Sequence, residues 1–294
     1  MGQMLIMDNN KRGADRMKRY TLGLYEKSMP NNLSFAEKLL CAKECGFDYL
    51  EISIDETDEK LARLDMSKEE RKYLVDVMAV CGVPIRTMCL SGHRKYPLGS
   101  LDEGTRAKGM EIMKKAIDLA DDLGIRVIQI AGYDVYYEEG NDKTKKYFEE
   151  NLRKSVEYAA EKGVILAFET METEFMNTVE KAMEYVKLID SPYLQVYPDC
   201  GNVTNAALDY NTTAFDDFKT GKGHIAAVHL KETVPGKFRE IPFGTGHVNF
   251  EKIIETSWEL GVRRFTLEFW YVGNEDWKDV IKFNKRFIEE KFAA

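Results

Sequence analysis

Four short apolar runs in the second half of the chain decide the fold: VILAFET (residues 164–170), LQVYPD (194–199), IAAVHL (225–230) and FTLEFW (265–270). They are rich in β-branched and aromatic residues and nearly continuous in apolar character. That pattern is typical of strands buried on both faces of a parallel sheet. Each run is followed by a longer stretch with helical period, so strands and helices are expected to alternate.

The first half of the chain repeats this alternation, with strands expected at residues 20–25, 48–54, 84–90 and 126–132. Two of the helices between them begin with a capping box, Ser34 with Glu37 and Ser67 with Glu70. Glycines fall between helix and strand, where a left-handed C-cap residue is favoured, at Gly46, Gly82, Gly124, Gly163 and Gly261. Eight strand–helix units predict an α/β fold, a single (β/α)8 TIM barrel.

A doubly wound open sheet is the competing architecture. It usually has fewer strands, and no G-x-G-x-x-G motif follows the first expected strand, so the barrel is favoured. We expect the barrel to span residues 19–294 and residues 1–18 to form an N-terminal extension outside it. The extension reads as an artefact of the start site or of cloning, with Met17 the more natural beginning, and its apolar stretch is too short for a signal peptide.

Composition narrows the class of partner. The 294 residues are 44% hydrophobic and 31% charged, with a formal net charge of −8, which excludes a disordered or fibrous chain. The acidic balance argues against nucleic acid or an anionic membrane as partner but allows an anionic small molecule in a local basic pocket. The five cysteines include no C-x-x-C pair, as expected of reduced thiols in a cytoplasmic protein. No apolar run approaches the ~20 residues that span a bilayer.

Ionisable residues stand late in each of the last four expected strands: Glu169, Asp199, His229 and Glu268. In a barrel, functional groups lie at the C-terminal ends of the strands, and neighbouring strands bring them together. A buried carboxylate needs a partner or a metal ion. Three carboxylates and one imidazole suit one divalent ion, Mn²⁺, Zn²⁺, Mg²⁺ or Co²⁺. The pattern therefore predicts a metal site.

At these residues the chain resembles a known family. The segments AFETME, VYPDCGN, AVHLKE, FREIPFGTG and TLEFW, with LGLYEKSMP near the start and CLSGHRKYPLGS after the third strand, are similar to the xylose-isomerase-like barrels. They are most similar to the bacterial L-ribulose-5-phosphate 3-epimerases of L-ascorbate utilisation, also called L-xylulose-5-phosphate 3-epimerases. The resemblance runs from about residue 20 to the C-terminus.

The resemblance implies that Glu169, Asp199, His229 and Glu268 hold the metal ion and that the two glutamates are the acid–base pair. A metal ion on O2 and O3 of a ketose would acidify the C3–H bond and hold the enediolate, and one carboxylate on each side would exchange the proton. Asn202 stands where the related epimerases of free ketoses have His, which favours a phosphosugar substrate. The implied protein is a cytoplasmic enzyme, and a homodimer.

Substrate contacts are expected at residues His93, Arg94 and Arg239, because phosphate binding needs cationic donors, and a solvated basic loop is the alternative for the first two. Asn202 is a further expected substrate contact. Glu172, close after Glu169, is either a contact near the site or a surface charge. Loop amides near Gly244 could add donors to phosphate. Tyr25 and Trp270 could pack on the sugar or belong to the core.

Other functions fit less well. Abasic-site endonucleases share this barrel but use three zinc ions, many histidines and a basic surface, whereas this chain has four histidines. A non-catalytic binding barrel needs no metal cluster. The nearest rivals are a hexulose-6-phosphate isomerase, which moves a proton between C1 and C2, and a free-ketose 3-epimerase. The stereochemistry of the product separates isomerase from epimerase.

Overall fold

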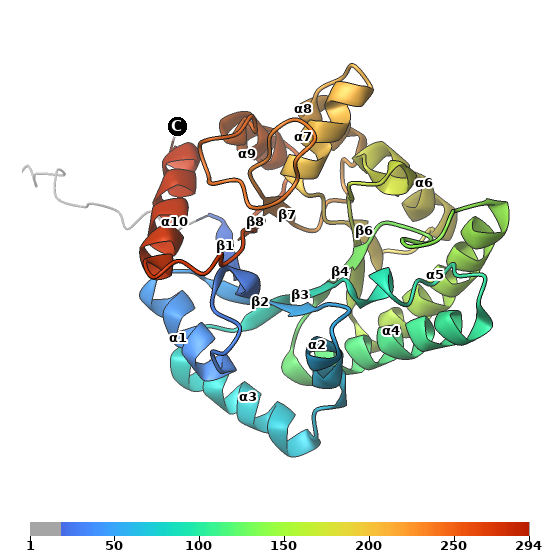
Figure 1. Ribbon diagram of the computed structural model, residues 1–294, viewed down its shortest axis with the longest axis horizontal. Helices are drawn as coiled ribbons and strands as arrows, with labels where there is room; N and C mark the ends of the chain where they lie inside the picture. Colours follow the sequence, from blue (N-terminus) through green and yellow to red (C-terminus); the bar gives the residue numbers. More distant parts are fainter. Residues whose placement is uncertain (1–18, 294) are drawn as a thin grey trace, which may run out of the picture.

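Eight parallel strands form the centre of the molecule, and helices surround them (Figure 1). The computed structural model describes residues 19–293, so the extension expected at residues 1–18 lies outside the described part. The strands are β1 (Thr21–Tyr25), β2 (Tyr49–Ile54), β3 (Ile85–Leu90), β4 (Val127–Ala131), β5 (Ile165–Glu169), β6 (Leu194–Val196), β7 (Val228–Leu230) and β8 (Arg264–Leu267).

The sheet closes on itself. Its hydrogen-bonded order is β6-β5-β4-β3-β2-β1-β8-β7, with every pairing parallel. Parallel bridges between Val196 and Ile225 and between Asp199 and His229 join the two outer strands of that order. Closure removes the sheet edges, and the predicted (β/α)8 barrel is confirmed.

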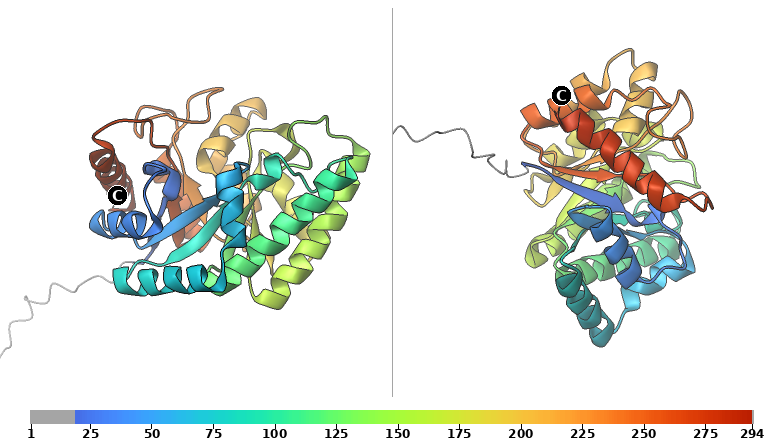
Figure 2. Two further views of the ribbon diagram at one scale, coloured as in Figure 1. Left: turned by 60° about the horizontal axis from the view of Figure 1, so that its bottom comes forward. Right: turned by 90° about the vertical axis from the view of Figure 1, so that its left-hand side faces the viewer.

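Ten α-helices are described: α1 (Phe35–Glu44), α2 (Asp58–Ala62), α3 (Lys68–Cys81), α4 (Glu103–Leu123), α5 (Asp142–Lys162), α6 (Val179–Ile189), α7 (Cys200–Asp209), α8 (Ala214–Thr220), α9 (Phe250–Glu259) and α10 (Trp277–Ala293). They enclose the strands from all sides, and α10 returns beside α1 (Figures 1 and 2). Both predicted capping boxes are present, at α1 and α3. All five predicted glycines have positive φ, as a left-handed position requires.

The last strands are shorter than the sequence predicts. β6 stops at Val196, and the chain then turns through Pro198, which cannot donate to a ladder, into α7. Asp199 is therefore the N-cap of α7 rather than a strand residue. Glu268 lies one residue beyond β8, although its amide still donates to the carbonyl of Leu230 at 3.0 Å. Both carboxylates remain at the C-terminal end of the barrel.

The interior of the barrel is packed but partly polar. Tyr49 and Tyr197 are fully buried, and a Cβ atom at Gly23 would lie only 2.2 Å from the Tyr49 ring, so this strand position needs glycine. Both tyrosine hydroxyls hydrogen-bond to Thr266 Oγ1, at 2.8 and 2.5 Å. Between the sheet and the helices the core is apolar. Within residues 19–293 no helix combines the length and apolar character needed to cross a membrane.

Candidate active site

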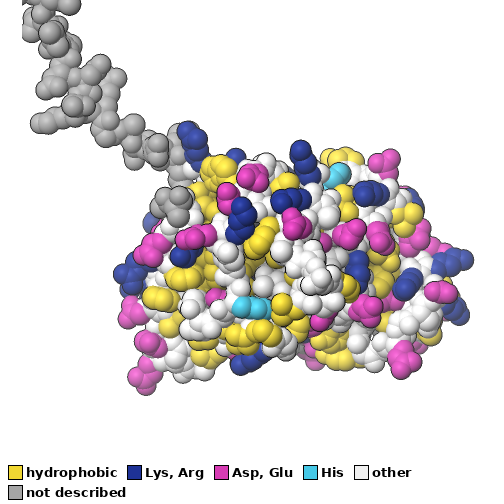
Figure 3. Space-filling model, turned by 90° about the horizontal axis from the view of Figure 1, so that it is seen from above, with side chains coloured by type: hydrophobic (Ala, Val, Ile, Leu, Met, Phe, Trp, Pro, Cys, Tyr) yellow, Lys and Arg dark blue, Asp and Glu magenta, His cyan; other side chains and the backbone are white. Residues whose placement is uncertain are grey.

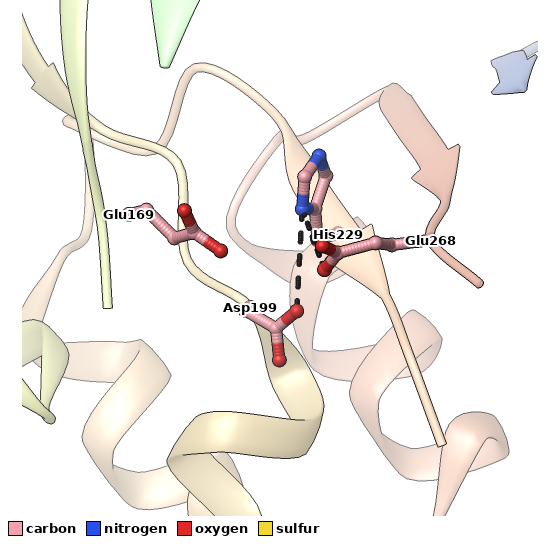
Figure 4. A group of neighbouring side chains, drawn as sticks. All are labelled: Glu169, Asp199, His229 and Glu268. Carbon is pink, nitrogen blue, oxygen red and sulfur yellow. Dashed lines mark hydrogen bonds and ion pairs between the residues drawn. The ribbon is translucent and has the colours of Figure 1, made fainter. Parts of the chain in front are cut away.

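Four ionisable side chains meet at the C-terminal end of the barrel. Glu169 ends β5, Asp199 begins α7, His229 lies in β7 and Glu268 follows β8. Each offers one ligand atom, and these atoms all lie within 4.8 Å of one another. Glu169 and Glu268 face each other from opposite sides of the group (Figure 4). The residues predicted to converge are brought together, and all four are buried.

The helix cap of α7 orients Asp199. Its Oδ1 accepts the amide hydrogen of Asn202 at 2.7 Å, which satisfies one of the orphan donors at the start of the helix. The amide of Asp199 donates to Thr170 Oγ1 at 3.0 Å and ties α7 to the end of β5. Asp199 Oδ2 is buried and forms no hydrogen bond, although Lys231 Nζ lies 3.0 Å from it, and it belongs with the other ligand atoms of the cluster.

A carboxylate outside the four-residue cluster, that of Glu51 in β2, orients His229. Glu51 Oε1 lies 2.6 Å from His229 Nε2, and its Oε2 accepts hydrogen bonds from Thr87 Oγ1 at 2.6 Å and Tyr197 OH at 2.9 Å. A carboxylate accepts, so in the metal-free protein Nε2 donates to Glu51 and Nδ1 donates to Glu268 Oε2 at 3.1 Å. Burial lowers the pKa of His229, but Glu51 and Glu268 outweigh it and raise this pKa well above its usual value. A carboxylate behind the far ring nitrogen is the usual support of a metal-binding histidine.

Sequence reasoning missed Glu51, although a signal existed. The run YLEISI carries one ionisable residue in an otherwise apolar strand, the same pattern that singled out the other four. Its partner, His229, is 178 residues away in sequence. Only the closed barrel brings the two together.

Lys231 was also missed. Its Nζ lies 3.0 Å from Asp199 Oδ2, 3.7 Å from Glu268 Oε2 and 2.8 Å from Asn202 Oδ1. The side chain is buried. Lys231 follows His229 by two residues, and residues two apart in a strand lie on the same face. The segment HLK therefore already indicated that Lys231 lies on the same side as His229.

The carboxylates occupy unequal electrostatic environments. Burial, helped by Glu268, raises the pKa of Glu169 to about 8, and burial raises the pKa of Asp199 to about 7. Burial acts the same way on Glu268, but Lys231 and His229 outweigh it and hold the pKa of Glu268 well below its usual range. Among the described residues, no group hydrogen-bonds to the Glu169 carboxylate. Two carboxyl groups thus favour protonation where no ion is present.

This donor set fits a divalent cation. Three carboxylates and one imidazole at the mouth of a barrel match the hard and borderline ligands of Mn²⁺, Mg²⁺, Zn²⁺ and Co²⁺. A bound cation would stabilise Asp199 Oδ2, which forms no hydrogen bond, and the buried Glu169 carboxylate, whose pKa is raised.

A cavity of about 70 Å³ adjoins the cluster. The predicted residues Arg94, Glu172, Asn202 and Arg239 line it, as do Tyr25 and Trp270. Arg239 Nη2 lies 3.0 Å from Glu172 Oε1, and this ion pair links the loop after β7 to the loop after β5. Glu172 therefore contacts a cavity arginine and is not an isolated surface charge.

Arg94 has no carboxylate partner within 4.0 Å among the described residues. Its guanidinium lies 4.8 Å from the centre of the Tyr136 ring, and its Nε is buried without a hydrogen-bond partner. An unpaired guanidinium on a cavity wall is a ready site for an anion.

Three further expected contacts already have partners within the protein. His93 is buried with Nε2 3.0 Å from the carbonyl of Gly109 in α4, and it is not among the cavity residues. The amide of Gly244 donates to Glu232 Oε2 at 3.0 Å, so it is not free for phosphate. Asn202 lines the cavity, but its side chain is engaged by Lys231 and Thr170.

A larger, open cleft of about 460 Å³ lies at the other end of the barrel, between the starts of β1, β7 and β8. Its described lining includes Arg19, Arg263 and Arg264 but neither carboxylate nor histidine, so it lacks an acid–base pair. On the face shown in Figure 3, acidic and basic side chains are interspersed and form no continuous basic surface.

Comparison with known proteins agrees with this geometry. Residues 40–290 match a family described as xylose isomerase-like TIM barrel. The chain is 46% identical over 260 residues to an L-ribulose-5-phosphate 3-epimerase of Shigella boydii serotype 18, covering 88% of this chain and 90% of the relative. Relatives of the same name from Escherichia coli O157:H7 match at the same identity and coverage.

Solved structures share the fold. A D-allulose 3-epimerase from Methylomonas sp., in complex with D-allulose, has a TM-score of 0.74 at 18% identity, covering 93% of this chain and 98% of that chain. An L-ribulose 3-epimerase has a TM-score of 0.72 at 18% identity, covering 93% and 96%. At such identities the likeness concerns the fold alone.

Proposed function

Because the chain belongs to the xylose isomerase-like TIM barrel family, we propose that it is a metal-dependent 3-epimerase that interconverts L-ribulose 5-phosphate and L-xylulose 5-phosphate. The 46% identity to relatives named for this activity confirms the predicted family and the predicted class of enzyme, the sugar epimerases. The substrate, the metal ion and the residue roles are the content of the proposal.

The placement of Glu169 and Glu268 carries the proposal. They come from β5 and from the residue after β8 and face each other across one site (Figure 4). Epimerisation at C3 of a 2-ketose removes the C3 proton on one side and returns a proton on the other. Two carboxylates on opposite sides meet this need, since one takes the proton as a base and the other donates one as an acid.

Glu169, Asp199, His229 and Glu268 would hold the metal ion, and Glu51 would keep the His229 ring in place. When bound, such an ion supplies Lewis acidity that makes the C3 proton easier to remove. The chain's own residues perform the other tasks. Glu169 and Glu268 exchange the proton, and the buried walls of the site exclude water from the intermediate.

Arg94 and Arg239 would hold the substrate phosphate. Both line the cavity, and a guanidinium offers a planar pair of donors to phosphate oxygens. The cavity of about 70 Å³ is far smaller than the ~300–1,000 Å³ typical of ligand sites. We infer that cavity-lining side chains move when a sugar phosphate enters, and that opening of the Arg239–Glu172 ion pair would free Arg239 for the phosphate. A cytoplasmic homodimer acting in L-ascorbate degradation stays a prediction from the resemblance.

One incubation tests the proposal. Metal-saturated protein is mixed separately with L-ribulose 5-phosphate and L-xylulose 5-phosphate in D₂O, with and without a chelator, and the products are identified by NMR. We expect each ketose to yield the other, with deuterium at C3 and no turnover under chelation. An aldose product would instead assign the protein to the C1–C2 isomerases. Preference for the unphosphorylated ketoses would assign it to the free-sugar epimerases.

A further inference from the structure

Lys231 places a buried positive charge inside the proposed active site. It lines the cavity together with Glu169 and Glu268. Its relative exposure is 4%, and its Nζ lies 5.9 Å from the centre of the Trp270 ring. Neither proton exchange by the two glutamates nor the phosphate contacts of the arginines uses this group.

The position of the ammonium is fixed by Asn202. Asn202 Nδ2 donates to the carbonyl of Thr170 at 2.8 Å, so its Oδ1 is turned toward Lys231 and accepts from Nζ at 2.8 Å. Of the three donors on Nζ, one goes to Asn202 and a second faces Asp199 Oδ2 at 3.0 Å. No third hydrogen bond of Nζ is formed within the described residues. Glu268 Oε2 lies 3.7 Å from Nζ, too far for a hydrogen bond. Since Lys231 lines the cavity, its remaining donor is available to a bound substrate.

The charge of Lys231 opposes a bound cation. An ammonium 3.0 Å from a metal-binding oxygen competes for that oxygen and repels a divalent ion across a buried site. A residue that only supported the metal site would carry a negative charge, as Glu51 does. Asp199 and Glu268 already lie beside Lys231 in the metal-free protein. When a cation neutralises them, a substrate oxygen that becomes negative during the reaction is the further group that the charge of Lys231 would stabilise.

We propose that Lys231 is a catalytic residue that donates its free N–H to a substrate oxygen on which negative charge develops as the C3 proton leaves. The proposal rests on the proposed function. The electrons of the C3–H bond move toward that oxygen, the proton passes to the carboxylate, and Lys231 keeps its own proton throughout. Fixed donors aimed at developing charge are among the largest contributions to enzymatic rates.

The test replaces Lys231 with neutral side chains, Lys231→Met and Lys231→Gln, and measures two quantities in parallel. One is the affinity for Mn²⁺ in the absence of substrate. The other is kcat and KM for L-ribulose 5-phosphate at saturating Mn²⁺. The matched control is Lys285→Met, because Lys285 is also a lysine with a mostly buried side chain beside a carboxylate, Glu289 at 2.5 Å, but it does not line the cavity.

The two quantities should move in opposite directions. We expect Mn²⁺ affinity to rise by at least ~3-fold, because a competing charge is gone. We expect kcat to fall by ~10²–10³-fold, as for loss of one oxyanion donor, with a smaller change in KM. Lys285→Met should change kcat by less than ~3-fold.

Three results would overturn the proposal. Near wild-type kcat in both Lys231 variants would show that the ammonium is dispensable. Weaker Mn²⁺ binding together with activity restored by excess Mn²⁺ would show that Lys231 only supports the metal site. Wild-type protein that binds Mn²⁺ but does not epimerise the pentulose phosphates would overturn the proposed function itself, and this proposal with it.

Discussion

Replacing Glu169 by Gln in the metal-free protein should change how stability depends on pH. Gln keeps the size of the side chain and removes its titration. In the folded metal-free protein, burial and Glu268 raise the pKa of Glu169 from 4.5 to about 8. Below pH 4.5 the carboxyl is protonated in both folded and unfolded chains. As the pH rises toward 8, the unfolded chain ionises first, so the stability that the protonated carboxyl contributes is lost.

The size of this loss follows from the pKa. Moving it from 4.5 to about 8, at 1.36 kcal/mol per pKa unit, corresponds to roughly 5 kcal/mol. Glu268 and Asp199 interact with Glu169 and readjust when it is neutralised, so we expect ~2–5 kcal/mol. Glu169→Gln should therefore gain this much stability over wild type between pH 5 and pH 9.

Urea unfolding in EDTA, at one-unit steps from pH 5 to pH 9, measures the difference between variant and wild type. Glu172→Gln is the control, because Glu172 is part-buried and paired with Arg239 at 3.0 Å. Saturating Mn²⁺ should abolish the advantage of Glu169→Gln, since the ion stabilises the ionised carboxylate. Parallel stability curves for wild type and Glu169→Gln in EDTA would refute the uncompensated carboxylate on which the metal site rests.

The remaining predictions concern the metal ion and the phosphate. Glu51→Gln should weaken Mn²⁺ affinity by ~10–100-fold, because it removes the negative charge behind His229 Nε2; an unchanged titration would contradict that role. Arg94→Met and Arg239→Met should each raise the KM for L-ribulose 5-phosphate at least ~10-fold and leave the slow reaction of free L-ribulose unchanged; equal losses on both sugars would count against a phosphate site. Exhaustive chelation should abolish turnover, and about one divalent ion per chain should restore it; full activity without metal would remove the metal from the mechanism.

Much of the fold follows from local pattern. Each of these patterns depends on only a few neighbouring residues: the eight apolar runs, the capping boxes at Ser34 and Ser67, and the glycines after the helices. All of them are present in the barrel. The four converging residues could be predicted because the ends of parallel strands meet at one end of a barrel.

Contacts across the barrel could not be predicted in this way. Glu51 meets His229 only because β2 and β7 face each other through the interior. The direction in which each side chain of a short turn points could not be predicted from the sequence either. His93 and Arg94 share the 3₁₀ turn Gly92–Arg94, yet one ring packs on α4 and the other side chain borders the cavity.

The central claim is that Glu169 and Glu268 exchange the C3 proton from opposite sides. The most direct measurement is deuterium incorporation at C3 from D₂O by metal-saturated Glu169→Gln and Glu268→Gln, starting from each ketose phosphate in turn. We predict that epimerisation falls at least ~10²-fold in both variants. Exchange should survive from L-ribulose 5-phosphate in one variant and from L-xylulose 5-phosphate in the other. Epimerisation at near wild-type rate by either variant would reduce that glutamate to a metal ligand at most and contradict the two-base account.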